Sequence, residues 1–430
     1  MSLSKIFLDY FFLIVIGLFC PVIQAQYNPP DGIYPDAVFN ESVKTVRLIK
    51  TEWEISYPIS HIEDENPMEL SFDELSRNAK NYSYTIIHCD ADWRQSRLIP
   101  TDYMTGFSVN YIRNYEYSFN TQIPYIHYRV SIPNEDVTLK LSGNYVIMVY
   151  ENGNERNPIL CKRFCITESA VTISATAYQA RLTAYRDEWQ QVDFVARTLQ
   201  PIENPYQDIK TVIIKNGQWN MALTGIRPLF VRQNELDYRQ EKATLFKAGN
   251  EFRPLDTKSI RYSSTRMTKI EFEPPTYHFY LYPDESRNTS RYLFYEDFNG
   301  RYSVQSEKTN NPDIETDYVY VHFTLKAPQD LNEGQVYVYG AFTNFNCTPD
   351  NLMRYNPEKG QYEARILLKQ GYYNYGYAFL PFKHPVIDDT MLEGSFYDTE
   401  NDYIIYMYHR SRTSRYDRLI GVNVVNTLHK

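Results

Sequence analysis

Apolar and aromatic side chains come in short runs along this chain, and turn-forming Pro, Gly, Asn and Asp residues separate the runs. This pattern is typical of packed antiparallel strands. In the N-terminal part the clearest predicted strands are 84–89, 125–132, 137–141, 143–150 and 159–167. We expect these strands to form one β-sandwich that ends near residue 168.

The same pattern continues toward the C-terminus. A second set of strands is predicted at 171–177, 190–197, 209–215, 229–231, 268–273, 277–282 and 292–295. The pair Asn216-Gly217 follows one of them and is a signal for a type I′ turn. Residues 235–248 are charged and predict either a short helix or a mobile loop. A third set of strands is predicted at 318–325, 335–340, 362–368, 372–379 and 403–408.

The predicted fold class is all-β, with two or three consecutive immunoglobulin-like β-sandwich domains. No long helix is predicted. A polar, turn-rich segment is the best linker in the chain. The expected order is a signal peptide at 1–25, sandwiches at 26–168, 169–298 and 318–430, and a linker at 299–317.

The first residues have the features of a secretory signal peptide. A single cation, Lys5, precedes an apolar run at 11–19, and the segment ends in small Ala25. The run is too short to span a bilayer. Cleavage before Cys20, as in a lipoprotein, is the alternative, but Phe19 is a poor residue at such a junction. We therefore expect an exported, soluble chain without a membrane span.

The composition narrows the range of partners. The net charge is −9, which argues against nucleic acid and against a basic membrane-docking surface. The chain holds 40 Tyr and 23 Phe but only 16 Gly. Tyrosine at this density suits strands with one wet face, and it is also enriched at protein interfaces.

The segment 88–93, HCDADW, concentrates reactive side chains that a strand does not require. His88 and Cys89 are neighbours and point to opposite faces of a strand, so they make a poor zinc or catalytic pair. Asp90 and Asp92 share a face, but no series of Asp and Asn ligands for calcium accompanies them. The favoured interpretation is a strand end followed by an Asp-rich turn that Trp93 covers. We predict no catalytic residue, metal site or cofactor, and no enzymatic activity.

Four cysteines follow the signal peptide: Cys89, Cys161, Cys165 and Cys347. Cys161 and Cys165 lie in one predicted strand and would be roughly 13 Å apart, too far for a disulfide. Two alternatives stay open. Either Cys89 forms a disulfide with Cys161 or Cys165, or the thiols are free and buried.

The third domain carries its own motif, GAFTNF at 340–345 followed by GYYNYGYAF at 371–379. It is similar to glycogen- and starch-binding sandwich modules, in which a Trp of the first motif stacks on a sugar. Phe345 stands at that position here. We therefore expect a shared fold rather than a shared ligand. A carbohydrate-binding accessory protein that acts through this domain is the alternative function.

The segment 88–93, together with DYMTGF at 102–107, YSFNT at 117–121, IPN at 132–134 and LSGNY at 141–145, resembles the plug-protein family of the type IX secretion system of Bacteroidota. The resemblance is most specific in the first domain. It implies a periplasmic protein, associated with the outer membrane, that docks on a large outer-membrane β-barrel translocon and closes its periplasmic mouth.

A docking protein of this kind would use exposed side chains of its first domain, because aromatic anchors dominate protein interfaces. Phe107 is expected in the core instead. The candidate partner-binding residues are Asp90, Asp92, Trp93, Tyr103, Tyr115 and Tyr117.

Overall fold

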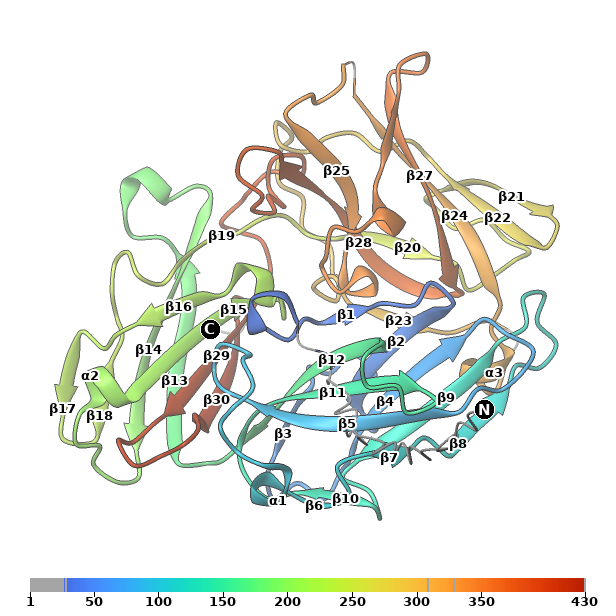
Figure 1. The fold of residues 1–430 in the computed structure, drawn as a ribbon. Helices are drawn as coiled ribbons and strands as arrows, with labels where there is room; N and C mark the ends of the chain where they lie inside the picture. The colour runs from blue at the N-terminus through green and yellow to red at the C-terminus, as the bar shows by residue number, and fades with distance from the viewer. Residues whose placement is uncertain (1–26, 28, 308, 328, 429–430) are drawn as a thin grey trace, which may run out of the picture.

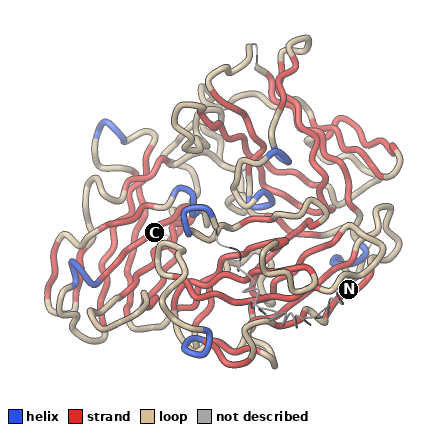
Figure 2. Tube along the Cα trace, viewed as in Figure 1, coloured by secondary structure: helices blue, strands red, loops and turns tan. Residues whose placement is uncertain are grey.

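The structure is a computed structural model, and it describes residues 27, 29–307, 309–327 and 329–428. The expected signal peptide at 1–25 lies outside the described residues. Strands dominate the described chain, and its helices are single turns (Figure 2). The all-β fold class is confirmed. The three α-helical turns are α1 (Pro100–Tyr103), α2 (Pro205–Asp208) and α3 (Pro312–Glu315), and the 3₁₀ turns are η1 (Pro30–Gly32), η2 (Thr183–Tyr185), η3 (Trp219–Met221), η4 (Ala341–Thr343) and η5 (Pro349–Asn351).

The first sandwich contains two main sheets and one small ribbon. One sheet runs in the order β1 (Ala37–Val38), β12 (Pro158–Thr167), β11 (Gly143–Glu151), β5 (Tyr82–Cys89) and β7 (Asn110–Tyr111), with β3 (Ile59–His61) parallel to β12. The facing sheet runs β2 (Val43–Lys50), β4 (Met68–Glu74), β9 (Ile126–Ile132) and β8 (Asn114–Tyr117). The ribbon pairs β6 (Met104–Gly106) with β10 (Val137–Leu139).

The second sandwich takes strands from two distant parts of the chain. Its outer sheet holds β13 (Val171–Gln179), β14 (Trp189–Thr198), β18 (Glu235–Asp237) and β17 (Phe230–Arg232), with β19 (Leu245–Lys247) beside β14. Its inner sheet holds β16 (Leu223–Ile226), β15 (Ile209–Lys215), β29 (Asp402–His409) and β30 (Arg418–Asn426). Figure 1 shows the two C-terminal strands in red among the green strands of this sandwich.

The third sandwich lies between these two parts in the sequence. One sheet is β20 (Arg253–Asp256), β28 (Gly371–Pro381) and β23 (Tyr302–Val304), with β25 (Gly334–Tyr339) also paired to β28. The other is β21 (Met267–Glu273), β22 (Thr276–Leu281), β24 (Tyr318–Lys326), β27 (Gln361–Lys369) and β26 (Arg354–Asn356).

The strand pairing divides the chain differently from the expected boundaries. Strand β22 pairs in parallel with β24, which places residues 267–281 in the third sandwich and not in the second. Strand β29 pairs antiparallel with β15 along the whole of β15, which places residues 402–426 in the second sandwich. The expected linker at 299–317 contains β23 and α3. It is part of the long connection between β22 and β24, which parallel strands need.

Two local expectations also differ from the structure. Residues 235–248 hold two short strands, β18 and β19, in place of the alternatives of a short helix or a mobile loop. Residues 292–295 are not a strand.

The turn predicted at Asn216-Gly217 agrees with the structure. Asn216 and Gly217 both have positive φ, 52° and 76°, as a type I′ turn requires.

The hydrophobic cores explain why some runs are apolar without alternation. Tyr84 and Ile86 of β5 face the core of the first sandwich, whereas Ile87 packs on the inner sheet of the second. On β29, Ile405 faces the second core, and Tyr406 faces the first sandwich. The two sandwiches therefore share a core, and β5 and β29 are buried on both faces.

Candidate functional site

Strand β5 ends at Cys89, and the chain then makes a tight turn. The Trp93 N–H donates to the Asp90 carbonyl at 2.9 Å, and Trp93 has a φ of 64°. The Asp90 N–H donates to the Arg94 carbonyl at 2.8 Å. This is the strand end and Asp-rich turn that the sequence predicted. His88 and Cys89 face opposite sides of the sheet, so they do not form one reactive site.

His88 is held in the first sandwich as a neutral side chain. Its Nε2 lies 3.3 Å from the Ser142 carbonyl, so this nitrogen carries the proton and donates. Its Nδ1 then accepts from the Ser96 hydroxyl at 2.9 Å. Burial lowers the pKa of His88 to about 4. The geometry gives His88 a packing role and leaves no lone pair for a metal.

The four cysteines of the described residues are free thiols, which is the second of the two alternatives that the sequence left open. Cys89 of β5 and Cys165 of β12 both stand opposite Asn144 of β11, on either side of that strand. Two strand spacings separate them by roughly 10 Å, beyond the reach of a disulfide. Cys161 also lies on β12, so the same strand separates it from Cys89. Burial raises the pKa of all three thiols, which keeps them protonated and unreactive.

Two of the candidate partner-binding residues are engaged by the chain's own second sandwich. Asp90 pairs with Arg410 at 3.1 Å and accepts a backbone N–H from Asp417. The Trp93 ring packs edge-on against Trp219, with centroids 4.8 Å apart. The turn is therefore an internal joint, and these two side chains have little surface left for a partner.

The remaining candidates divide between interior and surface. Tyr103 is buried, and its hydroxyl donates to the Ile86 carbonyl at 2.9 Å. Asp92 is exposed but pairs with Arg94 at 2.8 Å. Tyr115 and Tyr117 are exposed on β8, the edge strand of its sheet.

Further exposed aromatic side chains gather near these two tyrosines. The expectation that Phe107 belongs to the core is wrong, because its side chain is 78% exposed. It lies in the loop between β6 and β7, and β7 is the edge strand of the other sheet. We define the aromatic edge as the exposed aromatic residues on and beside β7 and β8, namely Phe107, Tyr111, Tyr115, Tyr117 and Phe119.

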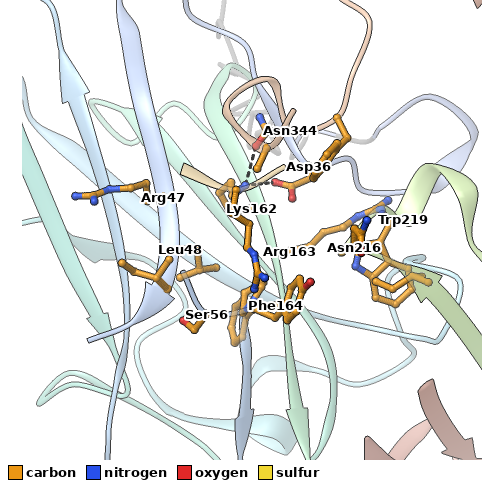
Figure 3. A pocket seen from close by; sticks show the side chains of 18 of the residues that line it. Asp36, Arg47, Leu48, Ser56, Lys162, Arg163, Phe164, Asn216, Trp219 and Asn344 are labelled. Carbon is orange, nitrogen blue, oxygen red and sulfur yellow. Dashed lines mark hydrogen bonds and ion pairs between the residues drawn. The ribbon is translucent and has the colours of Figure 1, made fainter. Parts of the chain in front are cut away.

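A cavity of about 400 Å³ lies where the three sandwiches meet (Figure 3). Its charged side chains are mostly compensated within the wall. Lys162 Nζ pairs with Asp36 at 2.8 Å and donates to Asn344 at 2.9 Å. The Arg163 guanidinium stacks on Trp93, 4.6 Å from the ring centroid. We find no nucleophile with an adjacent base among the side chains that line this cavity.

The described residues also contain a group of carboxylates with metal-ligand spacing, Glu251, Asp297 and Glu400. Sequence reasoning missed this group because the three residues belong to segments far apart in the chain. The block at 88–93 forms no such group within the described chain.

Phe345, at the position expected for sugar stacking, is buried. Its ring packs against Tyr339 at 5.3 Å and Phe252 at 6.2 Å. The ring face that a sugar would need is therefore occupied by the chain's own side chains.

Comparison with known proteins identifies the family. Residues 43–168 match the family model for the type 9 secretion system plug protein 1st domain. The crystal structure of a hypothetical protein from Parabacteroides merdae is 35% identical, covers 92% of this chain and 99% of its own, and has a TM-score of 0.89. None of the curated proteins compared with the chain matches it.

Two other solved structures match weakly. One is the BSP domain of a biofilm-associated protein, at 11% identity, covering 48% of this chain and 26% of that one, with a TM-score of 0.16. The other is native alpha-2-macroglobulin of Escherichia coli, spanning domains NIE to MG1, at 13% identity, covering 41% of this chain and 87% of that one, with a TM-score of 0.15. Scores this low carry no argument about fold or function. The match over 43–168 places the chain in the type 9 secretion system plug protein family.

Proposed function

We propose that this protein is a non-enzymatic periplasmic plug that docks on the large outer-membrane translocon barrel of the type IX secretion system and closes its periplasmic mouth. Membership in the plug family connects the protein with type IX secretion and with the cell envelope. The observation that carries the docking proposal is the aromatic edge, because it belongs to the very domain that the family model matches.

The aromatic edge has the chemistry of a protein interface. Tyr and Phe are enriched at interface centres, where they bury large areas at a low cost in side-chain entropy. Edge strands such as β7 and β8 also present unpaired backbone groups that another strand can use. A barrel mouth made of strands and strand turns could bind such an edge through both its side chains and its backbone.

Rigid bulk supports the second half of the proposal, that the protein closes a pore. The first and second sandwiches share a core, and the third is tied to the first through buried polar contacts. A body joined in this way resists deformation across its whole width. In the described part of the chain, every helix is a single turn, far shorter than a bilayer crossing needs. We include export by the signal peptide at 1–25 in the proposal.

The experiment is affinity purification of the tagged protein from detergent-extracted membranes of cells that carry the secretion system. We expect the wild-type chain to recover a very large barrel subunit. The double variant Phe107→Asp, Tyr117→Asp places two charges on the aromatic edge and should weaken binding by roughly 30-fold or more, as loss of hot-spot residues does. Tyr262→Asp is the matched control, because Tyr262 is 72% exposed but lies between β20 and β21 of the third sandwich.

Two results would contradict the proposal. If the wild-type chain never recovers a large barrel subunit, the protein is not a plug. If the double variant and the control recover it equally, the docking surface lies elsewhere on the molecule.

A further inference from the structure

Three carboxylates from distant segments meet at the boundary between the second and third sandwiches. Glu251 precedes β20, Asp297 lies between β22 and β23, and Glu400 precedes β29. One oxygen of each lies within 4.8 Å of the others. Three negative charges this close repel one another strongly unless a proton or a cation compensates them.

Protein side chains do not supply that compensation. Within the described residues, no Lys, Arg or His forms an ion pair with any of the three carboxylates. Arg287 is nearby, but it pairs with Glu393 at 2.7 Å and uses another nitrogen on the Glu251 backbone carbonyl. The cluster as it stands is short of positive charge.

Two buried oxygen atoms at the cluster have no hydrogen-bond partner among the described residues. They are Glu251 Oε2 and Asn299 Oδ1, on side chains that are only 1% and 3% exposed. The Asn299 amide lies at the cluster, because its Nδ2 donates to Glu400 at 3.1 Å. A buried oxygen without a hydrogen-bond partner is destabilising, so two of them on residues that contact the same cluster point to a ligand that binds oxygen atoms.

The surrounding donors hold the carboxylates in place and leave these oxygens free. The Tyr292 hydroxyl and the Glu400 N–H donate to Glu251 Oε1, at 2.5 and 3.0 Å, which leaves Oε2 free. The backbone N–H groups of Phe252 and Asn299 donate to the two oxygens of Asp297. A cation site needs this kind of support, because fixed ligands lose little freedom when the ion binds.

We propose that this cluster is a calcium site, formed by Glu251 Oε2, one carboxylate oxygen each from Asp297 and Glu400, and Asn299 Oδ1, with water completing the coordination. The ligands are all oxygen, which selects hard cations and disfavours zinc. Calcium tolerates the irregular geometry of a site assembled from three segments, whereas magnesium demands a near-ideal octahedron. The bound ion would lock the second sandwich to the third.

The proposal does not depend on the plug function, and a direct binding measurement tests it. The mature chain is dialysed against EDTA, exchanged into metal-free buffer and titrated with CaCl2 in a calorimeter. We expect one ion per chain and a rise in the midpoint of thermal unfolding with added calcium, because a ligand that binds only the folded state stabilises it. Titration with MgCl2 should give weaker binding.

Glu251→Gln tests the location of the site. The variant keeps the shape of the side chain. It replaces one carboxylate oxygen by an NH2 group and removes the negative charge, so calcium affinity should fall at least about tenfold. Unfolding in EDTA checks that the variant still folds, and removal of a repelling charge should leave that midpoint at or above the wild-type value. Glu333→Gln, at an exposed glutamate of the third sandwich, is the matched control and should bind calcium as the wild type does.

Three outcomes would overturn the proposal. The first is no calcium heat up to about 5 mM and no shift of the unfolding midpoint, which would mean that protons alone compensate the cluster. The second is unchanged affinity in Glu251→Gln, which would place the ion elsewhere. The third is magnesium binding as tight as that of calcium.

Discussion

His88 and Gly143 form one close contact in the interior of the first sandwich. A Cβ atom added at Gly143 would stand 2.4 Å from His88 Nε2, so any larger residue there would displace the ring. The contact joins two of the segments that carry the family resemblance, 88–93 and 141–145. At the residue scale, these segments are therefore explained by packing and hydrogen bonding rather than by catalysis.

The neutral state of His88 predicts a pH-dependent stability. Its pKa is about 4 in the folded protein and about 6.5 in an unfolded chain, so the unfolded state binds more protons between these values. The contribution is fully present above pH 6.5 and falls as the pH falls, and the loss of stability amounts to about 3 kcal/mol at pH 4. Urea unfolding at a series of pH values should show this loss in the wild type and not in His88→Gln. Parallel curves for the two proteins would contradict it.

At the element scale, the apolar runs of β5, β11 and β29 show what periodicity can and cannot predict. The runs predict strands correctly, and their lack of alternation indicates burial on both faces. Periodicity does not say which sheet covers the second face. Here the sheet of β15 and β29 covers the second face of β5 and β11. Strand β29 joins this sheet after the chain has passed through the third sandwich, and it pairs with β15 along seven residues.

The return of β29 and β30 to the second sandwich predicts how fragments of the chain behave. A fragment 318–430, the third domain as the sequence suggested it, lacks β20, β21, β22 and β23, and it carries β29 and β30 without β15, the strand on which β29 pairs. We expect it to give no cooperative thermal transition by circular dichroism. A fragment 250–400 holds the strands of the third sandwich and is the control, for which we expect a transition. A cooperative transition in fragment 318–430 would restore the sequential boundaries.

On the scale of the whole molecule, a buried charge pair joins the first and third sandwiches. Asp73 of β4 accepts from Lys369 Nζ of β27 at 2.7 Å, from the Tyr318 hydroxyl at 2.7 Å and from His127 at 2.6 Å. Burial alone would raise the pKa of Asp73, but Lys369 and His127 outweigh it and lower the pKa. The pair stays charged, and neither partner can be removed alone without leaving a buried charge.

We therefore expect Lys369→Met to lower the free energy of unfolding by about 3–5 kcal/mol, because Asp73 would keep its charge without its main cation. Lys359→Met is the control. Lys359 pairs with Glu363 at 2.9 Å on the surface, where such a pair contributes less than about 1 kcal/mol. Guanidinium unfolding measures both variants. Similar losses in the two would show that the buried pair does not hold the sandwiches together.

Much of the candidate site was outside the reach of the sequence. The turn at 88–93 was predicted, because turn chemistry depends on residues a few positions apart. The exposure of Phe107 was not, because an apolar residue in a short loop can face the core or solvent, and only the packing around it decides. The separation of Cys89 from Cys165 depends on β11 lying between their strands, which pairing across the fold decides.

The sequence by itself determined most of the long strands, the all-β class and the family, because these depend on local periodicity, turn residues and short motifs. Tertiary structure alone decided which strands complete which sandwich, which aromatic residues form an exposed edge, and that Glu251, Asp297 and Glu400 meet. The physical reason is the same in each case. Each feature depends on which segments of the fold pack together, whereas a strand's own pattern shows that it is buried without naming the segment that buries it.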